Sequence, residues 1–328
     1  MTDKLTEPPL VGTGSLSTQP GSELTEIEAG VNDPVPAALD QGLEVKARSQ
    51  WSFARRRFFR HRMAVAGILV LVIVFSGGIF ANQLAPYDPT LPTADITVKP
   101  TFAGHHFFGT DQIGRDYFSR TLFGIRSTEE VSLLVAAIAT VIGIFVGASA
   151  GYFGGWIDNL LMRITDLFLI VPALAILLVA AKYLGHGSPV RLAILLGLLF
   201  WTNIARIVRG NFLSLKEKEY IEAAKASGSG NFRIMFRHIL PNTMGPIVVS
   251  ATLLTGLAIL TESTISFLGF GLDLSLGELI QEGQAAGLNL WWLVTMPGLT
   301  IVLIILCVNF IGDGLRDALD PTQRRIRA

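Results

Sequence analysis

The chain has 328 residues, of which half are hydrophobic and 16% are charged, and its 26 basic and 26 acidic residues balance. This composition is too apolar and too poor in charge for an ordinary soluble domain. We therefore expect a protein that crosses the lipid bilayer several times, with no nucleic-acid partner.

The first 45 residues hold eight acidic residues against one lysine, and they are rich in Ser, Thr, Pro and Gly. They show no hydrophobic period, so the sequence predicts a disordered cytoplasmic tail over residues 1–45. Residues 46–62 then carry seven basic residues and no acidic one. Two interpretations of this basic segment stay open: an amphipathic, membrane-proximal helix on the anionic inner leaflet, or the positively charged flank of the first span.

Six uncharged or nearly uncharged runs approach or exceed the roughly 20 residues that a helix needs to cross a bilayer. They cover residues 63–80, 131–153, 160–183, 190–208, 242–261 and 288–311. The runs are continuous rather than alternating, which predicts helices and not a barrel. The third and fourth are the weakest, because Arg163, Asp166, Pro172 and Arg191 interrupt or border them. The predicted fold class is an all-α membrane protein with six transmembrane helices.

After the first span, Asp111, Arg115, Asp116 and Arg120 recur at helical spacing among apolar residues. This pattern predicts an amphipathic helix at the outer interface whose charges form structural ion pairs. The adjacent histidines 105–106 have no carboxylate at ligand spacing, so we interpret them as a surface pair rather than a metal site.

The charged segment 210–241 separates the fourth and fifth spans, and local signals divide it into a helical hairpin. Ser214 followed by Glu217 matches a capping box, which predicts the start of the first helix. Gly228 opens a Gly-Ser-Gly stop, and we expect it in the left-handed conformation.

The second helix of the hairpin is predicted over residues 232–240, with Asn231 as its cap and Pro241 at its end. Its apolar face comprises Phe232, Met235, Phe236 and Ile239.

Glu262 ends the fifth span on the predicted outer side. An unpaired carboxylate in hydrocarbon is costly, so we expect it to face a partner or a water-filled cavity, or else to cap the turn that follows. Glu262, Ser263, Ser266 and Phe267 are the candidates for a pathway or an outer gate.

The distribution of Lys and Arg sets the predicted orientation, because positively charged flanks resist translocation. With a cytoplasmic amino terminus, the inner segments hold 20 of the 26 basic residues. Both termini and the segment 210–241 are then cytoplasmic. The single cysteine, Cys307, lies mid-span, where we expect it to pack; it excludes an internal disulfide and a CxxC site.

Several segments carry a family resemblance. Glu222-Ala223-Ala224, followed by Gly228 and by His238-Ile239-Leu240-Pro241, resembles the EAA loop of binding-protein-dependent ABC importers. Residues 108–126 (GTDxxGRD, then SRxxxGxR), 262–271 (ESxxSFLGxG) and 313–321 resemble the dipeptide/oligopeptide/nickel branch, and in particular its C-type permease subunit. Two features depart from that pattern: the long amino-terminal tail, and the absence of a proline-rich insert after Gly271.

The resemblance implies a type I ABC importer permease fold with a cytoplasmic coupling hairpin. It implies that ATPase coupling depends on Glu222, Ala223, Ala224, Gly228, His238, Leu240 and Pro241. Together with the composition of the first 62 residues, it divides the chain into the tail 1–45, the basic segment 46–62, the first transmembrane helix with its outer loop at 63–128, a permease core at 129–312 with five helices and the coupling loop 210–241, and a cytoplasmic tail at 313–328.

The implied partners are a homologous second permease subunit, two ABC ATPase subunits that hold ATP and Mg, and an extracytoplasmic substrate-binding protein delivering di- or oligopeptides. The implied location is the bacterial plasma (inner) membrane. The chain has no GxxxxGK[ST] loop and no soluble domain large enough for an ATPase, so we expect no catalysis, cofactor or metal in this chain itself.

Three alternatives stay open. The same transporter class also handles nickel and other small solutes. An ion-coupled carrier would need ionisable residues in mid-span, whereas the charges here cluster at the predicted span ends. A membrane-embedded enzyme would need a catalytic set such as HExxH or GxSxG, and neither motif occurs.

Overall fold

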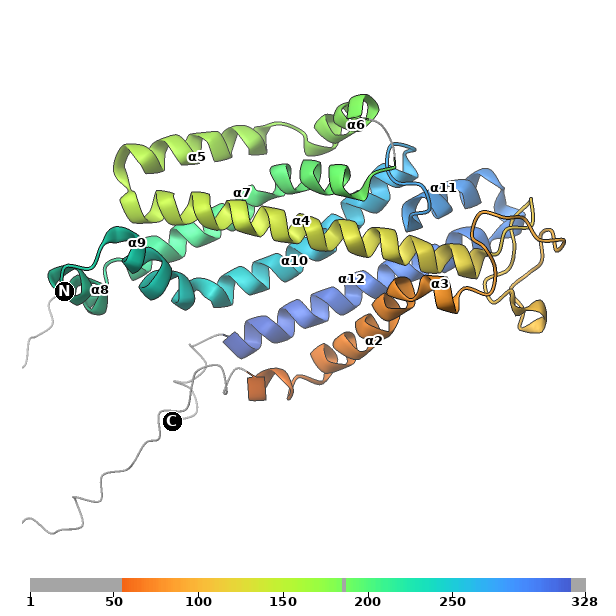
Figure 1. Ribbon diagram of the computed structural model, residues 1–328, viewed down its shortest axis with the longest axis horizontal. Helices are drawn as coiled ribbons and strands as arrows, with labels where there is room; N and C mark the ends of the chain where they lie inside the picture. The colour runs from red at the N-terminus through yellow and green to blue at the C-terminus, as the bar shows by residue number, and fades with distance from the viewer. Residues whose placement is uncertain (1–54, 185–186, 320–328) are drawn as a thin grey trace, which may run out of the picture. The chain divides into compact units, whose positions relative to one another are not determined.

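The computed structural model describes residues 55–184 and 187–319, and the named elements in these ranges are all helical (Figure 1). The expectations for residues 1–54 and for the end of the chain from 320 lie outside the described residues. The longer helices are α2 (Arg62–Ile79), α4 (Tyr117–Phe153), α5 (Gly155–Ile170), α6 (Ala173–Leu184), α7 (Pro189–Leu215), α10 (Leu240–Phe267) and α12 (Trp292–Leu319). The shorter elements are α3 (Ala81–Leu84), η2 (Ala103–His105), α8 (Glu219–Ala226), α9 (Asn231–Arg233), η3 (Ile234–Ile239), α11 (Leu276–Ala285) and η4 (Leu288–Leu290).

Five of the described helices are long and apolar enough to cross a membrane: α2, α4, α7, α12 and the continuous helix from Asn231 to Phe267. Helices α5 and α6 supply a sixth crossing if the pair counts as one span bent by 77°. The bend follows from Pro172, because a proline disfavours helical geometry in the residue before it, and Val171 is extended with ψ 130°. The all-α class is confirmed, while the predicted third span is a broken helix.

Several helices extend beyond their apolar runs. Helix α4 begins at Tyr117 rather than at residue 131, and α7 continues to Leu215 rather than ending at residue 208. The hydropathy pattern marks only the apolar stretch, whereas backbone hydrogen bonding continues wherever packing supports it. Arg206 and Arg209, predicted to lie at or beyond a span end, are therefore inside α7.

Helices α4 and α7 make the most extensive contact of any described helix pair, and small residues allow their close approach. A Cβ at Gly147 would overlap the carbonyl oxygen of Ala205, and one at Gly143 would lie 2.7 Å from Ile204. Gly151 meets Phe212 in the same way. The residue numbers rise together along both helices, so α4 and α7 run parallel, and α5 with α6 must bring the chain back between them.

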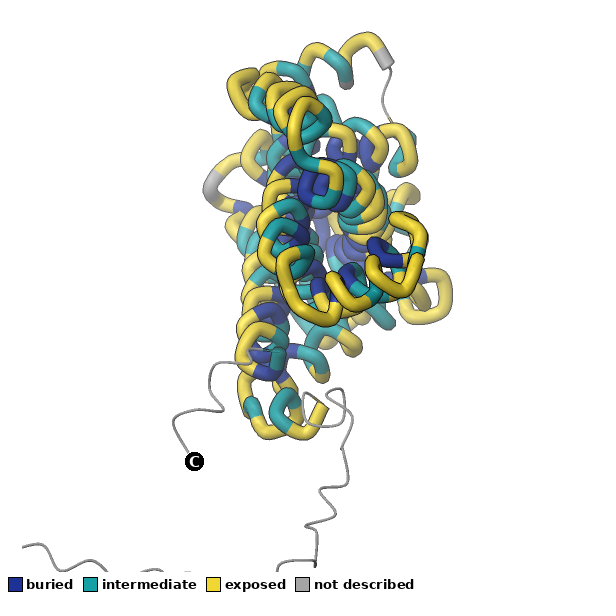
Figure 2. Tube along the Cα trace, turned by 90° about the vertical axis from the view of Figure 1, so that its left-hand side faces the viewer, coloured by how far each residue is buried: buried dark blue, intermediate teal, exposed yellow. Residues whose placement is uncertain are grey.

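Helix α12 packs antiparallel to both α2 and α10. Gly67 of α2 approaches the backbone of Cys307, and Gly314 near the end of α12 approaches Ala64. Cys307 is buried, in line with the packing role expected of it. Viewed along the bundle, buried positions line the space between the helices and exposed positions cover their outward faces (Figure 2).

The two groups of predicted site residues lie far apart in the bundle. Helices α8 and α9 lie at one end of the bundle, whereas α11 and the loop between α3 and α4 lie at the other (Figure 1). The predicted coupling residues and the predicted outer-gate residues are therefore at opposite ends.

Candidate functional site

The hairpin, which we define as residues 216–241, is attached to the bundle by apolar side chains. Ile221 of α8 is fully buried and belongs to the same core cluster as Phe212, Ile234 and Ile239. The next residue, Glu222, is exposed, as is Ala223, and Ala224 is half-buried. Helix α8 thus turns one apolar side toward the bundle and presents its Glu-Ala side outward.

The first helix of the hairpin begins later than the capping-box prediction places it. Helix α7 continues through Ser214, so this serine does not cap a new helix. Helix α8 starts after Lys218, whose side chain makes no capping hydrogen bond. Glu219 and Glu222 in its first turn favour this start, because the amino end of a helix carries partial positive charge.

The turn after α8 has the geometry expected from the sequence. Gly228 adopts φ +76°, in the left-handed region that a side chain disfavours. Its N–H donates to the carbonyl of Lys225 at 2.9 Å, and the next N–H, of Ser229, donates to Ala224 at 3.1 Å. These hydrogen bonds satisfy the last carbonyls of α8 and reverse the chain.

The second helix does not end at Pro241, contrary to prediction. Residues Asn231–Phe267 form one continuous helix that includes α9, the π-helical turn η3 and α10. A proline inside a helix removes one hydrogen bond and crowds the preceding turn. The π turn just before it absorbs this disruption, since the N–H of Leu240 donates back to Met235.

The remaining predicted coupling residues lie on this π turn and just after it. His238 and Leu240 are half-buried, and Pro241 is exposed. The carbonyl of His238 accepts a hydrogen bond from the Asn242 amide at 2.7 Å. The predicted cap Asn231 does not cap the helix; its side chain instead accepts a hydrogen bond from the Tyr152 hydroxyl at 2.9 Å, which ties α4 to the hairpin.

One member of the predicted apolar face of the second helix is misplaced. Met235 and Ile239 are buried, but Phe232 is 72% exposed, and its ring packs against that of Phe236 with the ring centroids 4.4 Å apart. The helical period alone cannot tell whether the first position of such a face reaches the bundle.

At the other end of the bundle, Glu262 is fully buried among hydroxyl groups. Thr128 of α4 donates to its carboxylate at 3.0 Å, Ser266 donates at 2.8 Å, and Ser263 is 3.3 Å away. Within the described residues this carboxylate joins α4 to α10. Its expected position in a pathway or outer gate stays a prediction.

The chain after Glu262 folds back tightly over the end of α10. The N–H of Leu272 donates to the Ser266 hydroxyl at 3.2 Å, and a Cβ at Gly271 or Gly277 would overlap Ser266 or Ser263. Phe267 is half-buried at the last turn of α10. The glycines of this segment therefore permit the close return of the backbone.

Helix α11 begins with a capping arrangement that the sequence signals but that sequence reasoning missed. Ser275 accepts a hydrogen bond from the N–H of Glu278 at 3.2 Å, and the Glu278 carboxylate accepts one from the N–H of Leu274. Burial raises the pKa of Glu278 above its usual range, and the Leu274 hydrogen bond opposes that rise.

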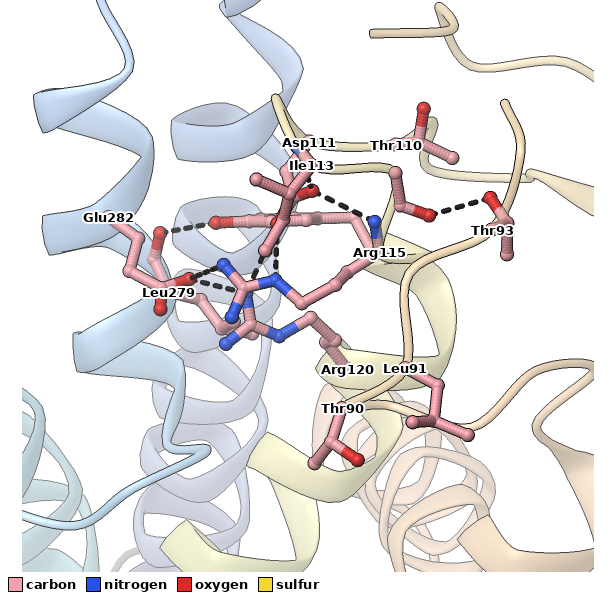
Figure 3. A network of polar contacts seen from close by, with 12 residues as sticks. Thr90, Leu91, Thr93, Thr110, Asp111, Ile113, Arg115, Arg120, Leu279 and Glu282 are labelled. Carbon is pink, nitrogen blue, oxygen red and sulfur yellow. Dashed lines mark hydrogen bonds and ion pairs between the residues drawn. The ribbon is translucent and has the colours of Figure 1, made fainter. Parts of the chain in front are cut away.

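A charge network joins the loop before α4 to α11 (Figure 3). Arg115 contacts Asp111 at 2.6 Å and Glu282 at 3.1 Å, and the buried Arg120 also pairs with Glu282. The expected pair of Asp111 with Arg115 is confirmed, whereas Asp116 pairs with His106 rather than with Arg120. The expected helix is not confirmed, because Asp111 and Arg115 lie in a loop. Asp116 caps α4 by accepting from the N–H of Ser119 at 2.7 Å. Glu282 was missed because it lies more than 160 residues away in sequence.

His106 is not a surface residue, contrary to prediction. It is 1% exposed, its Nδ1 lies 2.8 Å from Asp116, and its ring stacks on Tyr87 at 4.7 Å. In the ranges that the structure describes, no group of three or more His, Cys, Asp or Glu residues could hold a metal ion.

Comparisons with known proteins show the family to which this sequence belongs. Residues 139–325, which include the hairpin and Glu262, match the family described as "Binding-protein-dependent transport system inner membrane component". The chain belongs to this family of inner membrane components. Residues 49–102 match a second family, "N-terminal TM domain of oligopeptide transport permease C".

The relatives carry consistent descriptions. The chain is 40% identical to the oligopeptide transport system permease protein OppC of Escherichia coli K12 over 291 residues, which is 87% of this chain and 96% of the relative. It is 38% identical to OppC of Mycobacterium tuberculosis H37Rv over 83% of this chain and 94% of that protein. It is 35% identical to the dipeptide transport system permease protein DppC of Alkalihalophilus pseudofirmus over 92% of this chain and 99% of that protein. The resemblance seen in the sequence is confirmed, and with it the type I permease fold.

Proposed function

We propose that this chain is the transmembrane permease subunit of an ABC importer for di- or oligopeptides, and that the hairpin receives the ATPase. The observation that carries the proposal is the build of α8. Its Glu222 and Ala223 face outward while Ile221 joins the bundle core. A partner that binds the outward face of α8 is therefore linked to the bundle core through the same short helix.

The continuous helix after the turn connects the hairpin to the opposite end of the bundle. It has 37 residues, which corresponds to about 55 Å at the helical rise per residue. Its start is tied to α4 by the Tyr152–Asn231 hydrogen bond and its far end by the Thr128–Glu262 hydrogen bond. A displacement of the hairpin therefore moves α10 together with the hydroxyl groups around Glu262.

ATP hydrolysis belongs to the partner ATPase subunits, which hold ATP and Mg, and this chain performs no covalent chemistry. The assembly contains a homologous second permease and two ATPases, and an extracytoplasmic binding protein supplies the peptide. The named functions of the relatives, oligopeptide and dipeptide transport, support the peptide class. The chain lies in the bacterial plasma membrane with both termini cytoplasmic, as the excess of basic residues on that side favours.

The test is reconstitution of the chain with a homologous second permease, the ATPases and a binding protein from the same organism. We expect ATP-dependent uptake of a labelled peptide into proteoliposomes, and retention of the ATPase when this chain is purified. A complex that transports only an inorganic cation, or uptake without ATP and the ATPase, would contradict the proposal.

Substitution of Glu222 tests the role of the hairpin more specifically, because Glu219 on the same helix provides a matched control. Glu219 stands in the same first turn of α8 and is also exposed, so Glu219→Ala removes the same favourable interaction with the helix end, about 0.3–1 kcal/mol. Only Glu222 belongs to the EAA segment. We expect Glu222→Ala to lower ATPase retention and uptake, and Glu219→Ala to leave both near the parent level.

A further inference from the structure

Two helices carry polar side chains at positions where a lipid-facing span would carry apolar ones. On α5, Asn159 and Arg163 are exposed and Asp166 is half-exposed; on α7, Asn203 and Arg206 are exposed. Spacings of three and four residues place the members from each helix on one side of it. We call these five residues the polar stripe.

An ion pair makes the stripe continuous across the two helices. The Nη2 of Arg206 donates to Asp166 at 2.6 Å, while the two side chains keep 49% and 45% exposure. Closer to the hairpin, the Arg209 guanidinium makes two hydrogen bonds to the Asp158 carboxylate. These pairs hold α5 against α7, so the stripe is one surface of the bundle.

The stripe has one unbalanced charge. Asp166 neutralises Arg206, whereas Arg163 has no ion pair or hydrogen bond among the described residues. The amides of Asn159 and Asn203 likewise have no hydrogen-bond partner in that part of the chain. The stripe therefore presents one net positive charge and two free amides.

Lipid is a poor environment for these groups. Arg163 and Asp166 lie three and six residues inside the third apolar run, which begins at residue 160, or about 4.5 and 9 Å along the helix axis. Charged residues inside a span normally face a water-filled cavity or a partner charge. The surface must then be covered by water or by protein.

We propose that the polar stripe lines an aqueous pathway between this chain and the second permease, and that Arg163 receives a carboxylate of the peptide. The inference rests on the proposed function, since it takes the peptide and the second permease from it. A free guanidinium beside two amides suits a carboxylate, which accepts several hydrogen bonds at once. The rival arrangement, in which the second permease covers the stripe in a dry interface, is an outcome of the test.

The test measures water access and local charge in the assembled complex. Single cysteines replace Asn159 or Asn203 in a Cys307→Ala background, and each complex is treated with the anionic thiosulfonate MTSES or the cationic MTSET. Leu198→Cys is the matched control: it is also exposed on α7, but five residues turn a helix by roughly 140° net, away from Asn203.

We expect both stripe cysteines to react and Leu198→Cys to stay unreactive. After correction for the reactivity of a simple thiol, MTSES should react roughly fivefold faster than MTSET, because Arg163 attracts the anion. Arg163→Gln should abolish that preference without reducing MTSET reaction, and should lower uptake of a peptide with a free carboxylate more than Arg163→Lys does.

Failure of the inference and failure of the proposed function give different results. A complex that takes up peptide but leaves both stripe cysteines unreactive overturns the pathway and indicates a dry interface or lipid. Reaction without a charge preference overturns the role of Arg163. A parent chain that does not retain the ATPase overturns the proposed function instead, and that is measured before any cysteine is introduced.

Discussion

Substitution of Gly228 perturbs the hairpin turn through the backbone alone. Gly228 has φ +76°, and no atom lies within 4 Å of the position that a Cβ would occupy. A side chain there meets no steric obstacle from neighbours, so its cost is that of the left-handed conformation, about 1–2 kcal/mol. Such a change lowers the population of the native turn roughly 5- to 30-fold relative to alternatives.

Gly230 provides the matched control two residues further on. It has φ −67° and ψ 153°, which any residue adopts, it precedes α9 as its N-cap, and it too has open space at Cβ. Serine is a favoured N-cap residue. We expect Gly230→Ser to be neutral or slightly stabilising, and Gly228→Ser to be destabilising by the amount given above.

The assay is ATP-dependent peptide uptake by the reconstituted complex, with protein level and ATPase retention measured on the same samples. Gly228→Ser should reduce uptake several-fold and Gly228→Val should reduce it further, since a β-branched residue resists the left-handed region more strongly. The affinity of the binding protein for its ligand should not change. Equal uptake by Gly228→Val and Gly230→Val complexes at equal protein levels would refute the reasoning.

Three further predictions concern other parts of the chain. An impermeant thiol reagent should label Asp273→Cys in intact cells but not Glu222→Cys; labelling of position 222 from outside would reverse the topology. Glu262→Ala should destabilise the protein by about 2–4 kcal/mol, because it leaves buried hydroxyls without an acceptor and opens a cavity. Glu262→Gln should be tolerated, and equal thermal stability of the two variants would contradict the structural role of this carboxylate. Deletion of residues 2–44 should leave a transport-competent complex, since their composition cannot offset the entropy of ordering; loss of uptake would make the tail a partner-binding element.

The sequence was most informative where local chemistry determines structure. Gly228 was expected in the left-handed region, and it is there, because only glycine adopts that conformation without cost. The apolar runs located the five described helices that are long and apolar enough to cross a membrane, and Pro172 marked the point where the helix of the weak third run breaks.

Sequence reasoning failed where tertiary contacts override local signals. Ser214 has the pattern of a cap, yet the packing of α7 on α4 carries the helix past it. Pro241 has the pattern of a helix end, yet a π turn accommodates it. Glu262 has local partners at Ser263 and Ser266, but its partner Thr128 lies far away in sequence, as does the partner Glu282 of Arg120, so no local pattern could have identified these two contacts.

The central claim, that the hairpin receives the ATPase, is tested most directly by cross-linking. A photoactivatable maleimide is attached to Ala223→Cys in the Cys307→Ala background, and to Asp273→Cys at the other end of the bundle as the control; both positions are exposed. After illumination of the assembled complex, position 223 should give a cross-linked product containing the ATPase, and position 273 should give none. A product with the ATPase from position 273, or none from position 223 in a complex that transports peptide, would contradict the claim.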